Sequence, residues 1–317
     1  MTLPVRRPHE LPSTPEENRW LVQTLWGDEA VGIVGGEPKC YKSFLALDLA
    51  IAVASGAPCL RLFEPRQRGP VLVLSAEDSL PEVRRRIERI ATAASVPFAS
   101  LDIYVITRPQ VRLDVLDDRS DIKETVKKIG PKMIVLDPFV RLHRQDENAA
   151  SDVAPLLGFL REIQQKHHTA VVLVHHARKG GGSTRAGQAL RGSSELHAWG
   201  DSNLYLRKVG ENDFRMTVEH RAASSPGEFV VQLREDGPAL ALHATPIEQD
   251  ELEEASARPS PSQRIERVLQ EASGPLSIRQ LRDACRIRTT TLCETLDALA
   301  ADGRVRKSTR GYLIAAP

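Results

Sequence analysis

The chain has 317 residues, 41% of them hydrophobic, enough for roughly two domains with substantial cores. Its formal net charge of +1 excludes recognition of nucleic acid by overall charge, so any basic surface must be local. The four cysteines form no C-x-x-C pair, and the longest apolar run is too short to span a bilayer. We expect a cytoplasmic protein with free thiols and no membrane partner.

Residues 1–27 are expected to form an N-terminal arm followed by a helix. Four prolines in residues 1–15 favour an extended arm. Residues 16–26 have the spacing of a short amphipathic helix, with Trp20 and Trp26 packing in the core or on a neighbouring subunit.

The stretch GGEPKCYKS, residues 35–43, lies between an apolar run and a long apolar helix. From Gly36 it differs by one residue from G-x-x-x-x-G-K-[ST], in which a turn between strand and helix binds phosphate through backbone N–H groups. The pattern predicts that Lys42 reaches the β- and γ-phosphates of a nucleoside triphosphate and that the Ser43 hydroxyl binds Mg²⁺. The predicted nucleotide-binding residues are Gly36, Glu37, Pro38, Lys39, Cys40, Tyr41, Lys42, Ser43 and Phe44.

Tyr41 stands where that pattern has glycine. A tyrosine there must adopt helical angles or direct its ring away from the nucleotide, and its place just before a helix favours helical angles. The alternative for the whole stretch is an ordinary strand-turn-helix with an incidental Lys-Ser pair.

Short apolar runs and helical segments alternate along residues 28–245. This alternation predicts an α/β domain with a mostly parallel sheet covered on both faces. The expected strands are 70–75, 103–106, 133–136 and 170–176, followed by a meander of 204–207, 214–218 and 228–233.

Two carboxylates follow apolar strands in this domain. Nucleotide hydrolysis needs one carboxylate to hold Mg²⁺ and another to orient the attacking water. Asp137 and Glu77 come directly after strands and should open onto one crevice, so we assign the metal to Asp137 and the water to Glu77. Asp78 is a weaker competitor, and the alternative for each is a helix cap or a surface charge.

Together these segments make the chain similar to the RecA-type ATPases, which include plasmid RepA-like hexameric replicative helicases and DnaB- and KaiC-type motors. The resemblance covers about residues 28–235 and rests on GGEPKCYKSFLALDLA, VLVLSAED, IVLDPFVRLHRQDEN, VVLVHHARKGGG and ALRGSSELH. It implies a RecA-like P-loop core, ATP and Mg²⁺ as cofactors, and a homo-oligomeric ring, a hexamer by analogy with such helicases, with sites between subunits.

The same resemblance implies catalytic roles for Lys42, Glu77 and Asp137. It places His175 or His176 where related motors have a polar sensor of the γ-phosphate, although a histidine at a strand end is also often a hydrogen-bonded core residue. A basic residue from the neighbouring subunit usually completes such sites, and Arg207 is preferred here over Lys208 and Arg221.

A glycine-rich basic loop covers residues 177–187. We expect it to line the channel of a ring and to contact single-stranded nucleic acid through Lys179 and Arg185. The alternative is a surface loop without a role.

An acidic, proline-containing linker at residues 246–262 precedes a second domain at 263–317. Three helical segments and an alternating tail predict a winged helix-turn-helix. Residues 264–310 carry ten arginines and lysines against six acids. We expect duplex DNA contacts from Arg288, Thr289, Arg306, Lys307 and Arg310, although winged helices also bind proteins.

The resulting prediction is an ATP-hydrolysing helicase or translocase in the replication of a plasmid or mobile element. DNA would be its partner, as single strand in the ring and duplex at the winged helix, together with a replication initiator or a primase. One alternative is an ATPase switch that controls oligomerisation or partner recruitment without unwinding. Another is a winged-helix regulator with a decayed ATPase core; Tyr41 favours it, whereas Lys42, Ser43, Glu77 and Asp137 oppose it.

Overall fold

The computed structural model describes residues 3, 5–11, 15, 19–106, 110–176, 194–210, 212–247, 261–272, 274–285, 287, 289–308 and 311–314. It divides into two compact units, Met1–Pro246 and Ile247–Pro317. Each unit has a hydrophobic core of its own and is considered by itself.

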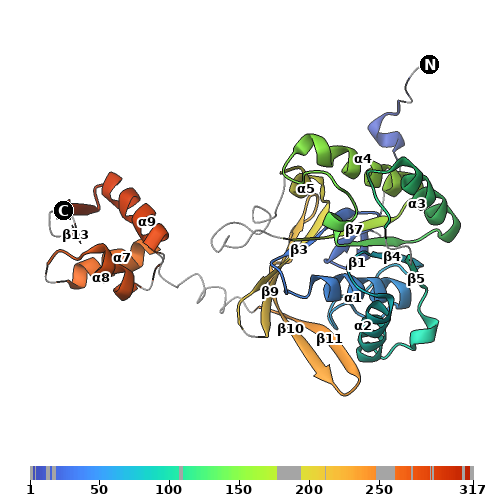
Figure 1. Ribbon diagram of the computed structural model, residues 1–317, viewed down its shortest axis with the longest axis horizontal. Helices are drawn as coiled ribbons and strands as arrows, with labels where there is room; N and C mark the ends of the chain where they lie inside the picture. Colours follow the sequence, from blue (N-terminus) through green and yellow to red (C-terminus); the bar gives the residue numbers. More distant parts are fainter. Residues whose placement is uncertain are drawn as a thin grey trace. The chain divides into compact units, whose positions relative to one another are not determined.

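A nine-stranded sheet runs through the first unit in the order β11-β10-β9-β8-β3-β7-β6-β4-β5 (Figure 1). The strands from β8 to β5 are mutually parallel, and β9 to β11 continue the sheet as antiparallel neighbours. This arrangement confirms the predicted α/β class. The bounds are β3 (Val31–Gly36), β4 (Val71–Ser75), β5 (Ile103–Ile106), β6 (Met133–Asp137), β7 (Ala170–His176), β8 (Ser202–Lys208), β9 (Asp213–His220), β10 (Glu228–Asp236) and β11 (Ala239–Pro246).

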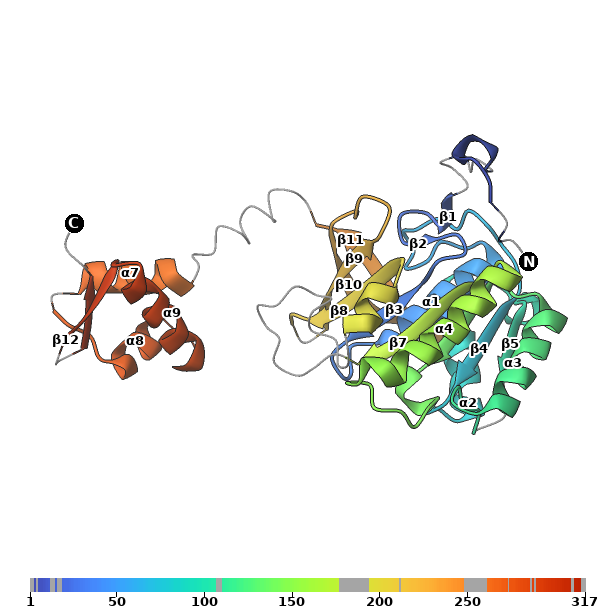
Figure 2. The same cartoon turned by 90° about the horizontal axis from the view of Figure 1, so that it is seen from above.

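Helices cover both faces of the parallel strands (Figures 1 and 2). Val71 and Val73 of β4 join the core beneath α1 (Lys42–Ser55) and α2 (Leu80–Ala93). Leu72 and Leu74 point to the other face, into the core formed with three further helices. Because both alternating sets are buried, the strands are continuous apolar runs rather than half-polar ones. The helices of the second face are α3 (Leu116–Ile129), α4 (Ala150–His167) and α5 (Ser194–Trp199).

The predicted N-terminal helix is wrong. After a short 3-10 helix, Pro8–Glu10, the chain forms an antiparallel pair of β1 (Trp20–Val22) and β2 (Trp26–Gly27). Thr24 turns the chain between them with φ 56°, and the fully buried Trp26 donates its indole N–H to the Ala30 carbonyl at 3.2 Å. Large and β-branched side chains at residues 20–22 suit a strand as well as one helical turn, so tertiary packing decided between them.

The meander is also longer than the sequence predicted. A fourth strand, β11, returns from the turn at Gly237 and pairs with β10 along its whole length. Along β11, burial of the side chains does not alternate from one residue to the next, so this segment has a weak strand pattern by itself.

In the residues that the structure describes, the second unit contains three helices and a two-stranded antiparallel hairpin. Their bounds are α7 (Pro261–Glu271), α8 (Ile278–Cys285), α9 (Thr289–Ala301), β12 (Val305–Ser308) and β13 (Gly311–Ile314). A serine cap begins α8: Ser277 Oγ accepts from the Gln280 N–H, and Gln280 Oε1 accepts from the Ser277 N–H at 2.9 Å. Leu276 exchanges both backbone hydrogen bonds with Tyr312 and ties the hairpin to the start of α8.

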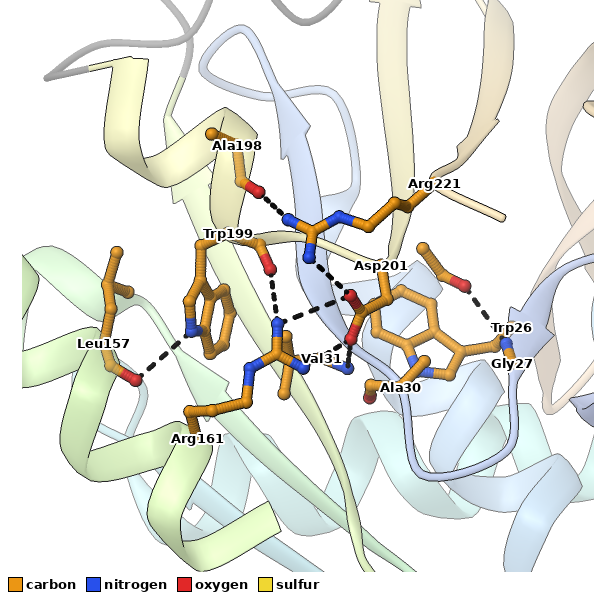
Figure 3. Close-up of polar contacts among 11 residues, drawn as sticks. Trp26, Gly27, Ala30, Val31, Leu157, Arg161, Ala198, Trp199, Asp201 and Arg221 are labelled. Atoms are coloured by element: carbon orange, nitrogen blue, oxygen red, sulfur yellow. Dashed lines mark hydrogen bonds and ion pairs between the residues drawn. The ribbon is translucent and has the colours of Figure 1, made fainter. Parts of the chain in front are cut away.

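At the amino end of β3, one carboxylate joins four elements (Figure 3). Asp201 forms an ion pair with Arg161 of α4 at 2.6 Å and with Arg221, next after β9, at 3.3 Å, and it accepts from the Val31 N–H. The two arginines also donate to the last carbonyls of α5, at Trp199 and Ala198. We call Asp201, Arg161 and Arg221 the Asp201 cluster.

Crossing a bilayer requires a helix that is both long and apolar, and none of the helices in the described ranges meets this requirement.

Candidate active site

The loop between β3 and α1 brings the chain close to β8 before the helix begins. A Cβ atom on Gly36 would lie 2.4 Å from the Leu206 carbonyl oxygen, so only glycine fits at this approach. Pro38 and Lys39 are exposed at the tip of the turn, whereas Cys40 is buried, and burial raises the pKa of its thiol. The thiol is therefore a protonated packing group at neutral pH.

Lys42 is the first residue of α1 and is only 5% exposed. Its Nζ donates to the Glu37 carbonyl at 2.7 Å, which folds the side chain over the loop. Burial lowers the pKa of Lys42, and the nearby Cys40, Asp137, Glu77 and Glu37 act in the opposite direction. A desolvated cation in this position interacts strongly with an anion that enters the loop.

Tyr41 does not have the helical angles that the sequence favours. It lies in the left-handed region, with φ 57° and ψ 29°, as the cap residue of α1. That is a conformation typical of glycine, and it costs a tyrosine about 1 kcal/mol. The ring is held edge-on by Phe44, at 5.8 Å between centroids, and by Phe214 of β9, at 5.2 Å. The residue therefore keeps the backbone turn of the phosphate-loop pattern, and its ring packs on the sheet.

The Ser43 hydroxyl lies beside the Asp137 carboxylate, which ends β6. Burial raises the pKa of Asp137 to about 6; the Ser43 hydroxyl lowers it in part, and the nearby Asp78 raises it further. A hydroxyl and a carboxylate in contact form the oxygen donor set that Mg²⁺ takes from P-loop proteins, where phosphates and water supply the other ligands. These two side chains therefore fit the ion.

Within the described residues, no group of three or more His, Cys, Asp or Glu side chains is placed to hold a metal ion. Ser43 and Asp137 therefore remain the candidate ligands, with a bound nucleotide supplying the rest.

Glu77 and Asp78 follow β4 and have different arginine partners. Glu77 Oε1 accepts from Arg141 Nε at 2.8 Å, and both side chains are well exposed, at 44% and 63%. Asp78 pairs with Arg86 of α2 at 2.5 Å, in a less exposed position. The surface pair of Glu77 is easily broken, whereas Asp78 is held by an arginine that also lies over the Phe44 ring.

The two histidines at the end of β7 differ in environment. In the parallel ladder His175 lies opposite Gly35 and His176 opposite Gly36, so both adjoin the start of the phosphate loop. His175 is buried, and its Nε2 lies 3.1 Å from Glu147 Oε1. His176 is partly exposed.

The predicted basic candidates divide between the two ends of the sheet. Arg207 and Lys208 are exposed at the end of β8, one and two residues beyond the partner of Gly36. Arg221 belongs to the Asp201 cluster at the opposite end. Lys179 and Arg185 lie outside the described residues.

The C-terminal nucleic-acid candidates are only partly described. Thr289 begins α9 and is exposed, as are Arg306 and Lys307 on β12, while Arg288 and Arg310 lie outside the described residues. Several other cations of this unit are paired with acids, for example Arg267 with Glu271 and Arg304 with Glu266.

Sequence reasoning missed four side chains that surround the predicted residues. They are Arg86, Arg141, His143 and Glu147. Arg86 belongs to a run of helical arginines whose pattern favours a solvated face, and the other three lie in residues 138–149, where no helical or strand period says which side chains turn inward. The spacing of His143 and Glu147 by four residues is a signal only once the fold places His175 beside them.

Comparison with known proteins gives one family and several distant relatives. The model of a family described as AAA domain matches residues 2–182. The DNA repair protein RadA of Synechocystis sp. (strain ATCC 27184 / PCC 6803 / Kazusa) is 21% identical over 235 residues, which cover 69% of this chain and 41% of RadA. The chain thus spans less than half the length of that relative.

Solved structures share the fold at low identity. A DnaB-like replicative helicase, solved in a study of its interactions with primase, is 13% identical with a TM-score of 0.51, over 68% of this chain and 59% of the helicase chain. The RadB recombinase is 15% identical, with a TM-score of 0.49 over 69% and 92% of the two chains. A KaiC-like protein from Pyrococcus horikoshii OT3 is 13% identical, with a TM-score of 0.48 over 73% and 96%.

Proposed function

The chain belongs to the AAA domain family, with the fold of the RecA-like P-loop ATPases, and from this premise we propose that it is a Mg²⁺-dependent ATP hydrolase that acts on DNA. The observation that carries the hydrolytic part is the contact of the Ser43 hydroxyl with the Asp137 carboxylate, next to the buried Lys42. Residues almost 100 positions apart thereby form one oxygen site beside one cation, which is what a phosphate-bound divalent ion requires.

In this proposal each residue has a separate task. Lys42 exchanges its bond to the Glu37 carbonyl for the phosphates, and the loop N–H groups bind them at the start of α1. Ser43 and Asp137 hold Mg²⁺, which when bound neutralises charge on the transferring phosphoryl group. Glu77 leaves Arg141 and orients the attacking water, and Arg207 serves the site of a neighbouring subunit.

The proposal for DNA rests on three observations. RadA is a DNA repair protein and the DnaB-like protein is a replicative helicase. The described helices and hairpin of the second unit are the elements that a winged helix would require, and its exposed Arg306 and Lys307 suit phosphate contacts. Residues 177–187, glycine-rich and basic in sequence, would contact a single strand inside a ring.

The finer proposal is a ring helicase of the RepA-like type that replicates a plasmid or mobile element. Its first test is ATP hydrolysis with and without single-stranded DNA, measured together with particle size with and without nucleotide. We expect hydrolysis to rise with DNA and the particle to reach the size of a hexamer. Absence of ATP hydrolysis in the wild-type chain would refute the proposal that the chain is an ATP hydrolase.

Strand displacement separates a helicase from the second candidate, a DNA-binding ATPase switch. The separate core of the second unit favours a switch, because a self-contained binding module can recruit partners without unwinding. DNA-stimulated hydrolysis without displacement of forked substrates would select the switch. Removing residues 259–317 should weaken duplex binding and leave ATP turnover intact; loss of turnover would refute the division of tasks.

A further inference from the structure

A buried cluster of two histidines and one carboxylate lies beside the phosphate loop. His175 Nε2 is 3.1 Å from Glu147 Oε1, and His143 Nε2 is 3.6 Å from the same oxygen. Both histidine side chains are 1% exposed and Glu147 is 15% exposed. The Phe139 ring forms one wall, with its centroid 4.5 Å from that of His143 and 6.3 Å from that of His175.

The environment keeps Glu147 ionised. Burial raises the pKa of Glu147, but the two histidines beside it outweigh this effect and lower the pKa to about 2. An ionised carboxylate accepts hydrogen bonds only, so Nε2 of His175 must carry the proton. Nδ1 of His175 is buried and has no hydrogen-bond partner among the described residues. The carboxylate therefore fixes both the protonated nitrogen and the plane of the ring.

Other histidine–glutamate pairs of the chain lack this setting. His168 with Glu29 and His197 with Glu219 have similar distances of 3.0 Å, but their side chains are 33% to 73% exposed. Solvent competes for such pairs, and they restrict the ring little. The buried pair is also the one next to the nucleotide site, because His175 lies opposite Gly35.

We propose that Glu147 is a positioning residue that holds the His175 ring in one orientation and protonation state for the reaction at the phosphate loop. This rests on the proposed ATP hydrolysis and selects His175, rather than His176, as the histidine that responds to the γ-phosphate. Glu147 lies in the connection of residues 138–149, which begins directly after Asp137 at the end of β6. One segment therefore joins the candidate metal carboxylate to the residue that holds His175. His143, on the same segment, lies 3.6 Å from the same carboxylate oxygen.

The substitution that isolates this role is Glu147→Gln. The amide has an oxygen that accepts from a protonated Nε2 and an NH2 group that donates to an unprotonated one, so the size is retained, whereas the charge and the selection of a single tautomer are lost. The matched control is Glu29→Gln, which removes the charge from a histidine pair at the amino end of β3, away from the phosphate loop. We expect Glu147→Gln to lower kcat for ATP by about 10- to 100-fold, with KM changed less than about 3-fold, whereas Glu29→Gln changes neither.

Histidine ring NMR of the full chain tests the positioning directly. The chain has nine histidines, so ring-labelled His175 is assigned by its loss in His175→Gln. We expect Glu147→Gln to shift the His175 ring signals toward the averaged position of an unrestrained imidazole, and Glu147→Asp to restore part of the wild-type shift. Kinetics are normalised to the fraction of chains that bind a fluorescent ADP analogue, so misfolded protein does not count.

Unchanged His175 signals in Glu147→Gln would overturn the proposal, and so would a wild-type kcat in that variant. If Glu29→Gln lowers kcat as strongly, the effect is general and the proposal is also overturned. A wild-type chain that binds ATP without hydrolysing it would refute only the proposed ATP hydrolysis. The ring signals would still show whether Glu147 holds His175.

Discussion

The two ends of β3 both place carboxylates next to cations, but with different chemistry. At the amino end, Asp201 is shared by two arginines, accepts from the Val31 N–H and anchors α5 (Figure 3). At the carboxyl end, Lys42 has its pKa lowered by burial, Asp137 has its pKa raised to about 6, and Glu77 has an exposed partner.

This difference separates anchoring from reactivity. Arginine stays protonated at every accessible pH and matches a carboxylate with two N–H groups, so the Asp201 cluster has one stable state. At the carboxyl end, burial acts against the charged forms of Lys42 and Asp137, and this cost is met when a charged ligand binds. The two ends should therefore respond to substitution in opposite ways.

The largest expected effect is at the carboxyl end. Lys42→Ala should reduce ATP hydrolysis by more than about 100-fold, because a buried cation that neutralises phosphate charge is lost. The free energy of unfolding should change by less than about 1 kcal/mol, since the desolvation cost of the ammonium disappears with it. Lys127→Ala, on the exposed side of α3, is the control. Equal losses of ATP hydrolysis from both substitutions would contradict a specific role for Lys42.

Asp137→Asn should remove Mg²⁺-dependent hydrolysis and stabilise the nucleotide-free chain at neutral pH. The pKa of Asp137 is about 6 in the folded chain, against an ordinary value of 3.8 for an aspartate, so the folded state holds the proton more tightly. This stability is fully present below about pH 4 and is lost as pH rises through about 6, a change of about 2–3 kcal/mol. Urea unfolding with a chelator from pH 4 to 8 should show a difference in the free energy of unfolding between variant and wild type that increases with pH. A difference that stays constant with pH would contradict the raised pKa of Asp137.

Asp201→Asn should affect stability and spare catalysis. Losing the carboxylate leaves two guanidinium groups without their ion pair and should cost about 2 kcal/mol, with kcat per folded chain within about 3-fold of wild type. The exposed Glu88, 4.0 Å from Arg84, provides a control, for which Gln should cost less than about 0.5 kcal/mol. Chemical denaturation and ATP turnover are measured on the same samples. A loss of turnover larger than the loss of folded protein would show that the two ends are coupled.

The smallest expected effect concerns Tyr41. Tyr41→Gly relieves about 1 kcal/mol of left-handed backbone strain but removes the ring from Phe44 and Phe214, which costs about 1–2 kcal/mol. The net loss of unfolding free energy should be about 1 kcal/mol or less, whereas Tyr41→Phe keeps both ring contacts and should be neutral. Stabilisation by glycine would mean that strain outweighs packing. Nucleotide affinity that is unchanged in both variants would make the substitution in the motif incidental.

The local sequence pattern was sufficient to predict a residue's position wherever that position depends on its neighbours in sequence. The buried strands are apolar on both faces, and β6 ends at Asp137, a residue assigned a role. The serine cap at Ser277 follows from a spacing of three residues. The prediction of an N-terminal helix was wrong because residues 20–26 are too few for their hydrophobic spacing to distinguish a turn of helix from a hairpin.

The sequence by itself therefore determined the α/β alternation, the phosphate loop and the carboxylates at strand ends, because the periods of helix and strand and the direction of parallel strands are local properties. The tertiary structure decided the left-handed turn at Tyr41, the hold of Glu147 on His175 and the capture of Asp201 by Arg161 and Arg221. The last two join residues about 20 to 40 positions apart, and only strand order brings such residues together. The first requires a ring on β9 to compensate for strain in the loop.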